Sequence, residues 1–327
     1  MDTLIFALNA VIPVLLLVVL GFALRRGGLL TGEFTRVANK LCYYVFLPTL
    51  MFCNIYKTSS LADIRYDVVG FSALGILALF LIGILLVRFI PDRGHKGAIS
   101  QCMFRSNFAM YGLPLAISLA GDAGGRTAAA LSVFSIPLFN ILAVYVLSRY
   151  SGTEEHKPDT GKIIKGIITN PLIIGCVCGF LALCIRMLFE KAGISFRLKD
   201  IKPLYDVLTQ LSAIASPMSL IVLGAQFEFS AANKLKKQIA LATFMRLVFA
   251  PLLVLGMAAV FLKDMGNGDW AGLIALFGSP VAVSSAILAR EMKSDYVLAS
   301  QLVVWTTLFS FITIFLIAIL FRTLGML

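Results

Sequence analysis

Long apolar segments separated by short polar ones make up most of the chain. Seven segments contain no Asp, Glu, Lys or Arg, and their apolar residues run continuously instead of alternating, which predicts helices and not barrel strands. About 20 residues of helix cross the hydrocarbon core of a bilayer, so each segment can span one. The seven segments are residues 3–24, 68–87, 127–148, 166–185, 207–227, 270–289 and 296–321.

Three further spans are predicted where polar residues interrupt the apolar pattern, at residues 37–56, 97–120 and 237–262. The total is ten transmembrane helices. Of the 327 residues, 59% are hydrophobic and 14% charged, whereas soluble domains carry about 25% charged residues. The fold class is therefore an all-α polytopic membrane protein, and the first segment, which lacks a basic start, is expected to be a retained helix.

The two halves of the chain share a pattern of proline and glycine. Four pairs of motifs occur in the same order, which predicts a first five-helix repeat over residues 1–150 and a second over 163–327. Five is an odd number, so the second half enters the membrane from the opposite side as an inverted repeat. The pairs are Pro13 and Gly21 with Pro171 and Gly179, Pro48 with Pro217, Gly112 and Pro114 with Gly278 and Pro280, and Leu138-Phe139 with Leu308-Phe309.

The chain has 28 Lys and Arg residues against 17 Asp and Glu residues, and most of the basic ones lie between the apolar segments. This excess indicates the cytoplasmic loop bias of membrane proteins and not nucleic-acid binding. The loops after helices one, three, five, seven and nine are the more basic, so both termini are predicted to lie outside the cell membrane.

Gly-x-Pro in the middle of an apolar span is the most informative local signal. Proline removes a backbone donor, and an adjacent glycine permits unusual dihedrals, so the helix breaks or kinks there. Matched breaks in an inverted repeat are typical of a transport site near the midplane. We expect such breaks at Gly112 to Pro114 in helix four and at Pro280 in helix nine. The alternative is that each proline only bends a packed helix.

Polar residues gather near both expected breaks, where they could bind a substrate carboxylate. Alternatively, hydroxyl groups in membrane helices bond a carbonyl of their own helix. The candidates are Ser106, Asn107, Ser279, Ser284 and Ser285.

Two arginines, Arg105 and Arg246, are the charges that lie well inside predicted spans. Intramembrane arginines are costly and tend to face a polar cavity, which would favour an anionic substrate. The alternative is that each side chain extends to the interface.

No motif for catalysis, a metal or a cofactor is present in the sequence. The two histidines lie in loops and the acidic residues map to loops or helix ends. We therefore expect no enzyme, no catalytic residue, no metal site and no cofactor.

Four motifs make the chain resemble the auxin efflux carrier family, which includes bacterial malate and malonate permeases and the plant PIN-FORMED carriers. They are residues 44–52 (YVFLPTLMF), 107–116 (NFAMYGLPLA), 136–140 (IPLFN) and 280–291 (PVAVSSAILARE). The resemblance implies a scaffold of helices one, two, six and seven that also forms a homodimer contact. It implies a transport domain of helices three to five and eight to ten, in which helices four and nine cross at Pro114 and Pro280, with Asn107 contacting the substrate carboxylate. The central loop is short here, which favours a permease of the bacterial type.

These observations predict a secondary transporter that moves a small organic anion across the cell membrane by alternating access, with proton or sodium coupling left open. The substrate-binding residues are expected among the ten candidates Arg105, Ser106, Asn107, Gly112, Pro114, Arg246, Ser279, Pro280, Ser284 and Ser285. The alternatives are a sodium-coupled symporter of the bile acid type and a non-transporting membrane receptor or subunit.

Overall fold

The computed structural model describes residues 2–58, 65–150 and 160–327, and every regular element in this part of the chain is a helix. Its one β-type feature is an isolated antiparallel bridge. The elements in chain order are α1 (Asp2–Arg26), α2 (Gly32–Leu41), η1 (Cys42–Phe46), α3 (Leu47–Tyr56), α4 (Tyr66–Leu86), η2 (Val87–Phe89), α5 (Arg93–Phe104), η3 (Phe108–Gly112), α6 (Leu113–Tyr150), α7 (Thr160–Ile168), α8 (Pro171–Lys191), η4 (Leu198–Asp200), α9 (Lys202–Ala225), α10 (Phe229–Lys234), α11 (Lys236–Phe244), η5 (Met245–Phe249), α12 (Ala250–Phe261), α13 (Asn267–Gly278), α14 (Ser284–Glu291) and α15 (Tyr296–Thr323).

Within the described residues, 6 helical stretches are long and apolar enough to cross a membrane. The first predicted span is the uninterrupted helix α1, which covers Asp2–Arg26. The spans predicted at residues 37–56, 97–120 and 270–289 are each divided into shorter helical elements. The 6 stretches are Tyr66–Phe89, Met110–Tyr150, Pro171–Lys191, Lys202–Ala225, Lys236–Phe261 and Tyr296–Thr323.

The long stretch α6 is two helices that fold back on each other. Ala120 and Gly121 have non-helical dihedrals, and Gly121 takes a φ of 57°, a conformation that glycine adopts readily. A Cβ at Gly124 would lie 2.1 Å from the carbonyl oxygen of Ala116. That approach is impossible within one straight helix, where eight residues span about 12 Å. The chain therefore reverses direction at Gly121, within the region predicted as the boundary between helices four and five.

Helix starts follow local capping chemistry. The side-chain oxygen of Asn170 accepts hydrogen bonds from the backbone N–H groups of Leu172 and Ile173, and Pro171 occupies the first helical position of α8. Proline is favoured there because its missing donor would have no partner within the helix. Asp295 caps α15 in the same way, by accepting from Leu298. The start points of these spans thus come from local sequence.

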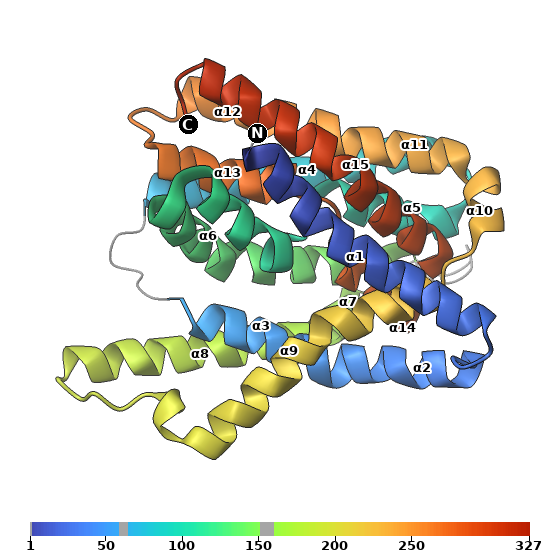
Figure 1. Ribbon diagram of the computed structural model, residues 1–327, viewed down its shortest axis with the longest axis horizontal. Helices are drawn as coiled ribbons and strands as arrows, with labels where there is room; N and C mark the ends of the chain where they lie inside the picture. The colour runs from blue at the N-terminus through green and yellow to red at the C-terminus, as the bar shows by residue number, and fades with distance from the viewer. Residues whose placement is uncertain (1, 59–64, 151–159) are drawn as a thin grey trace.

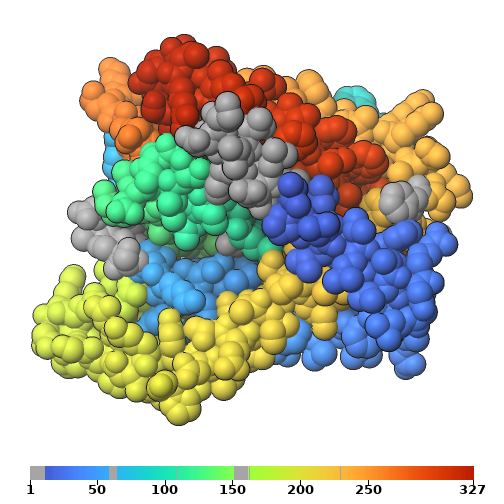
Figure 2. All heavy atoms as spheres, in the orientation of Figure 1, coloured from blue at the N-terminus to red at the C-terminus, as the bar shows by residue number. Residues whose placement is uncertain are grey.

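The helices form two layers (Figure 1). Helices α2, α3, α8 and α9 lie along one side, α4 to α6, α11 to α13 and α15 lie along the other, and α1 and α14 lie between them. The layer of α8 and α9 remains distinct at the lower edge of the space-filling view (Figure 2).

Glycines bring the backbones of two helix pairs close together, α1 with α9 and α8 with α3. A Cβ at Gly21 would lie 2.1 Å from the carbonyl oxygen of Ile221, so α1 and α9 touch directly. A Cβ at Gly179 would lie 2.8 Å from the carbonyl oxygen of Phe52, and this places α8 against α3 in the same manner. Small residues at such crossings are a common means of packing helices in membranes.

Candidate functional site

Two interrupted helices meet where α5 and α13 end. Helix α5 ends at Phe104, and the chain is non-helical until η3 begins at Phe108. Helix α13 ends at Gly278, and the chain is non-helical until α14 begins at Ser284. The two non-helical segments run antiparallel and pair at Ser106 and Val281.

Two backbone hydrogen bonds join these segments. The N–H of Asn107 donates to the carbonyl of Pro280 at 2.8 Å, and the N–H of Ala282 donates to the carbonyl of Arg105 at 3.3 Å. Backbone groups freed by a broken helix must find partners inside a membrane protein. Here each break supplies partners for the other. We call the paired residues 105–107 and 279–283 the crossing segment.

The break in helix four lies elsewhere than predicted. Gly112 ends the π-helical turn η3, and Pro114 is the second residue of α6, with an exposed side chain. Proline at the start of a helix removes a donor that has no helical partner, so it does not break the helix there. Counted from the last residue of each interrupted helix, Phe104 and Gly278, the residues Ser279 and Pro280 correspond to Arg105 and Ser106. The expected equivalence of Pro114 and Pro280 as crossing residues is therefore wrong, although Pro280 does lie in the crossing segment.

Arg246, from η5, binds the ends of both interrupted helices. Its guanidinium donates to the carbonyl of Ser279 at 2.7 and 3.0 Å, to that of Leu276 at 3.4 Å and to that of Met103 at 3.3 Å. Helices α5 and α13 both end there, so their partial negative charges converge on this cation. Arg246 is 0% exposed and holds the crossing segment in place. It does not line the crossing cavity described below.

Arg105 has a different environment, although it is also buried, at 2% exposure. Its guanidinium donates to Asn140 Oδ1 at 2.8 Å, to Ser284 Oγ at 3.1 Å and to Gln101 Oε1 at 3.4 Å. All three acceptors are neutral. Among the described residues no carboxylate pairs with Arg105, so it remains a buried cation without a counter-ion.

A cavity of about 30 Å³ lies against the crossing segment, on the side of Arg105. Its volume holds roughly two water molecules, so a larger solute requires the surrounding helices to move apart. We call it the crossing cavity. It is lined by Leu47, Leu50, Met51, Arg105, Ser106, Asn107, Met110, Ile136, Phe139, Asn140, Ala282 and Ser284.

Four of the ten candidate residues line this cavity: Arg105, Ser106, Asn107 and Ser284. The Oγ atom of Ser106 is buried and has no hydrogen-bond partner among the described residues. Asn107 precedes η3 and makes no side-chain capping bond. These two polar side chains are therefore available to a solute.

The remaining candidates lie outside the crossing cavity. Ser279 donates its hydroxyl to Ala275 within its own helix, as the bonding alternative for serine predicted. Ser285 is buried next to the cavity residue Ser284, and its hydroxyl has no hydrogen-bond partner within the part of the chain that the structure describes. Gly112 packs against the Phe108 ring, where a Cβ would lie 2.0 Å from the ring. Its role is thus to let η3 close.

Asn140 was not among the candidates, although it ends the motif at residues 136–140. It accepts from Arg105 and donates to the carbonyl of Ile136 at 3.0 Å. A buried amide in an otherwise apolar helix was the signal that could have identified it. Gln101, one turn before Arg105, contributes a further acceptor and gave no such signal.

The described residues contain no group of three or more His, Cys, Asp or Glu side chains placed to hold a metal ion. The polar groups at the crossing are an arginine, amides and hydroxyls. Such groups can bind a carboxylate through charge-assisted hydrogen bonds.

Comparison with known proteins places the chain in a family. Residues 6–318 match the family described as membrane transport protein. An uncharacterized transporter of Methanothermobacter thermautotrophicus is 24% identical over 308 residues, covering 94% of this chain and 95% of the relative. An uncharacterized transporter of Methanocaldococcus jannaschii is 24% identical over 317 residues, covering 94% and 96%. The family resemblance read from the helix motifs is confirmed, and the chain belongs to the membrane transport protein family as an integral membrane transporter.

Proposed function

We propose that the chain is a secondary transporter that carries a small organic anion, a carboxylate, past the crossing segment. One observation carries the proposal: Arg105 is a buried cation with neutral partners, and it lines a cavity beside unengaged polar side chains. An unpaired charge inside a membrane protein is costly, so such residues are typical of ion and substrate pathways. A bound carboxylate would supply the missing negative charge.

The groups around Arg105 suit a carboxylate. Asn107 can donate from its side-chain amide, and Ser106 from its hydroxyl. The N-terminus of α14 begins at Ser284, where the helix dipole favours negative charge. Arg246, by contrast, donates its hydrogen bonds to backbone carbonyl groups. We therefore assign it a structural role and not a substrate-binding role.

We further propose that the fold is an inverted repeat of ten spans. The glycine contacts support this arrangement. Under the pairing of helices one to five with six to ten, Gly21 corresponds to Gly179, and Ile221 of helix seven corresponds to Phe52 of helix two. Gly21 lies against Ile221, and Gly179 lies against Phe52. An inverted repeat requires this reciprocal contact.

The proposed mechanism is alternating access of the elevator type. Helices α1 to α3, α8 and α9 would form the scaffold, and α4 to α6 with α11 to α15 would form the transport domain. The crossing segment would move as a rigid unit, since its two breaks are hydrogen-bonded to each other and to Arg246. A homodimer through the scaffold, a cell-membrane location with both termini outside, and proton or sodium coupling belong to the same proposal.

The test is counterflow of radiolabelled mono- and dicarboxylates in proteoliposomes. Asn107→Ala and Arg105→Gln should each reduce uptake by at least tenfold, the order expected from losing a charge-assisted hydrogen bond. Pro114→Ala is the matched control, because Pro114 is exposed and lies outside the cavity, and it should keep uptake near wild type. Full uptake in both cavity variants would refute the site. Loss of uptake when sodium is replaced by potassium would favour a sodium symporter, and binding without counterflow would favour a receptor.

A further inference from the structure

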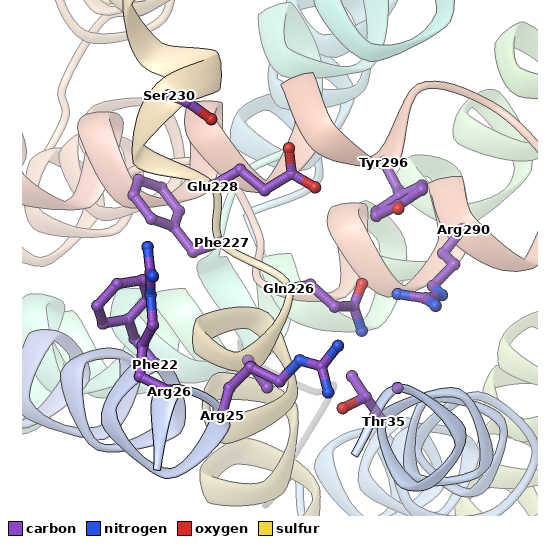
Figure 3. Close-up of a pocket in the computed structure, with 12 residues that line it drawn as sticks. Phe22, Arg25, Arg26, Thr35, Gln226, Phe227, Glu228, Ser230, Arg290 and Tyr296 are labelled. Atoms are coloured by element: carbon purple, nitrogen blue, oxygen red, sulfur yellow. The ribbon is translucent and has the colours of Figure 1, made fainter. Parts of the chain in front are cut away.

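A second and larger cavity is lined by residues of α1, α2, α14 and the chain that follows α9. Figure 3 shows its lining side chains. Its volume is about 400 Å³, in the range of small-molecule sites. It shares no residue with the crossing cavity. We call it the interlayer cavity, and it is lined by Phe22, Arg25, Arg26, Gly32, Thr35, Ala225, Gln226, Phe227, Glu228, Ser230, Arg290 and Tyr296.

Three arginines and one carboxylate give this cavity a positive balance. The guanidinium groups of Arg25 and Arg290 point into the same space, near Gln226 (Figure 3). Arg26 lies over the ring of Phe22, with 5.3 Å between the guanidinium carbon and the ring centroid. No ion pair among the described residues involves any of the three arginines, and Glu228 is the one acidic residue of the lining.

Counting partners in the described residues, Arg25 and Arg290 both retain N–H donors that make no hydrogen bond. Arg25 donates one hydrogen bond, at 2.9 Å, to the carbonyl of Leu30. Arg290 lies over the ring of Tyr296 at 4.7 Å, which fixes its plane and leaves its edge free. A guanidinium edge binds a carboxylate through two parallel hydrogen bonds.

The cavity is bounded by both groups of helices. Arg25 and Arg26 belong to α1 and Arg290 to α14, so the proposed scaffold supplies two of the arginines and the proposed transport domain supplies the third. Beside the cavity, Asn39 of α2 donates to Glu291 of α14 at 2.8 Å and accepts from Gln226, the residue after α9, at 3.3 Å. Any sliding of α14 along α1 would break these contacts and separate Arg25 from Arg290.

We propose that the interlayer cavity binds a small soluble dicarboxylate between Arg25 and Arg290, and that this anion holds the two helix groups in their present arrangement. The division into moving groups rests on the proposed function, whereas the binding site does not. The balance of three arginines against Glu228 matches two negative charges. A ligand that contacts both groups binds only where both arginines face it, so it favours this arrangement over any other.

The first test is thermal unfolding of the full chain in phosphatidylcholine nanodiscs, with succinate as the probe and acetate as the single-charge comparison. Succinate should raise the melting temperature more than acetate does. Arg290→Gln and Arg25→Gln should each weaken the succinate response by at least about tenfold in concentration, because each removes a charge-assisted pair. Arg290→Lys should recover part of it.

The matched control is Arg36→Gln, which also removes one positive charge. The Arg36 side chain is exposed on α2 and lies outside the cavity. It should leave the succinate response unchanged. An equal response in wild type and in Arg290→Gln would overturn the proposal. Suppose that phosphatidylglycerol in the disc raises the melting temperature and that succinate then has no further effect. This result would also overturn the proposal, because the occupant would then be a lipid headgroup.

The second test measures whether the anion keeps the two helix groups in their present arrangement. Asn39→Cys and Glu291→Cys replace two side chains in contact, in a background where the exposed Cys178 and half-buried Cys184 are changed to alanine. Succinate should increase the rate of disulfide formation between the introduced cysteines. No increase would overturn the holding role.

Asn107→Ala separates this inference from the proposed function. This variant should reduce uptake by at least tenfold and keep the succinate response that depends on Arg290. Retained uptake in Asn107→Ala would contradict the crossing site alone. A succinate response lost in Asn107→Ala and kept in Arg290→Gln would place the anion at the crossing and overturn the interlayer site.

Discussion

Replacing Arg246 with methionine tests whether this arginine holds the crossing segment. Methionine fills a similar apolar volume but donates no hydrogen bond. The substitution leaves the carbonyl groups of Met103, Leu276 and Ser279 without their shared donor, at 2.7 to 3.4 Å in the native structure. These carbonyls end two helices whose dipoles point at the same place.

The cost can be worked from the contacts. A hydrogen bond from a charged group contributes about 1.5–3 kcal/mol, and the short pair to Ser279 is the main one. The bonds to Met103 and Leu276 are longer and contribute less. Since such contributions do not add fully, we expect Arg246→Met to lower the free energy of unfolding by about 3–5 kcal/mol. Arg246→Lys, which keeps the charge without the planar fork, should cost about 1–3 kcal/mol.

The assay is equilibrium unfolding in mixed micelles with increasing dodecyl sulfate, followed by circular dichroism. Arg36→Met is the control, because the Arg36 side chain is exposed and its ion pair with Glu33 is long, at 3.8 Å. It should change the free energy of unfolding by less than about 0.5 kcal/mol. If Arg246→Met differed from wild type by no more than this control, the structural role of Arg246 would be refuted.

Two further predictions concern packing and charge. Gly179→Ala places a Cβ 2.8 Å from the carbonyl oxygen of Phe52 and should cost about 1–3 kcal/mol in the same unfolding assay, whereas Gly256→Ala, with nothing within 4 Å, should not destabilise; equal effects would contradict the close contact. Asn140→Asp puts a carboxylate next to Arg105, so it should raise the melting temperature and abolish anion uptake in proteoliposomes, and unchanged uptake would count against Arg105 as the anion-binding charge.

The 6 helical stretches that are long and apolar enough to cross a membrane were predictable because hydropathy and length act locally. Capping residues such as Asn170, with Pro171 after it, also mark a helix start without reference to the rest of the chain. The position of the break in helix four was not predictable in this way. Sequence pointed to Pro114, where a donor is missing, but the chain leaves the helix at Arg105, where the carbonyl groups find partners on another segment.

The two intramembrane arginines looked alike in the sequence. Both lie in apolar spans, and only long-range contacts distinguish them. Arg246 meets carbonyls from α5 and α13, which are distant in the chain, and Arg105 meets Asn140 and Ser284. Side-chain facing at such positions depends on how helices cross, and a single sequence does not encode that locally.

The most direct test of the account is a disulfide across the crossing segment. Ser106 and Val281 are a non-hydrogen-bonded antiparallel pair, because the two backbone hydrogen bonds are made by their neighbours. The Cα atoms of such a pair are about 4.5 Å apart, so Ser106→Cys with Val281→Cys should oxidise readily within one chain. In native membranes the double variant should form this intramolecular disulfide almost completely, as detected by mass spectrometry of the digested protein. Neither single variant should form it. A double variant that stays reduced under oxidising conditions would show that the two interrupted helices do not meet.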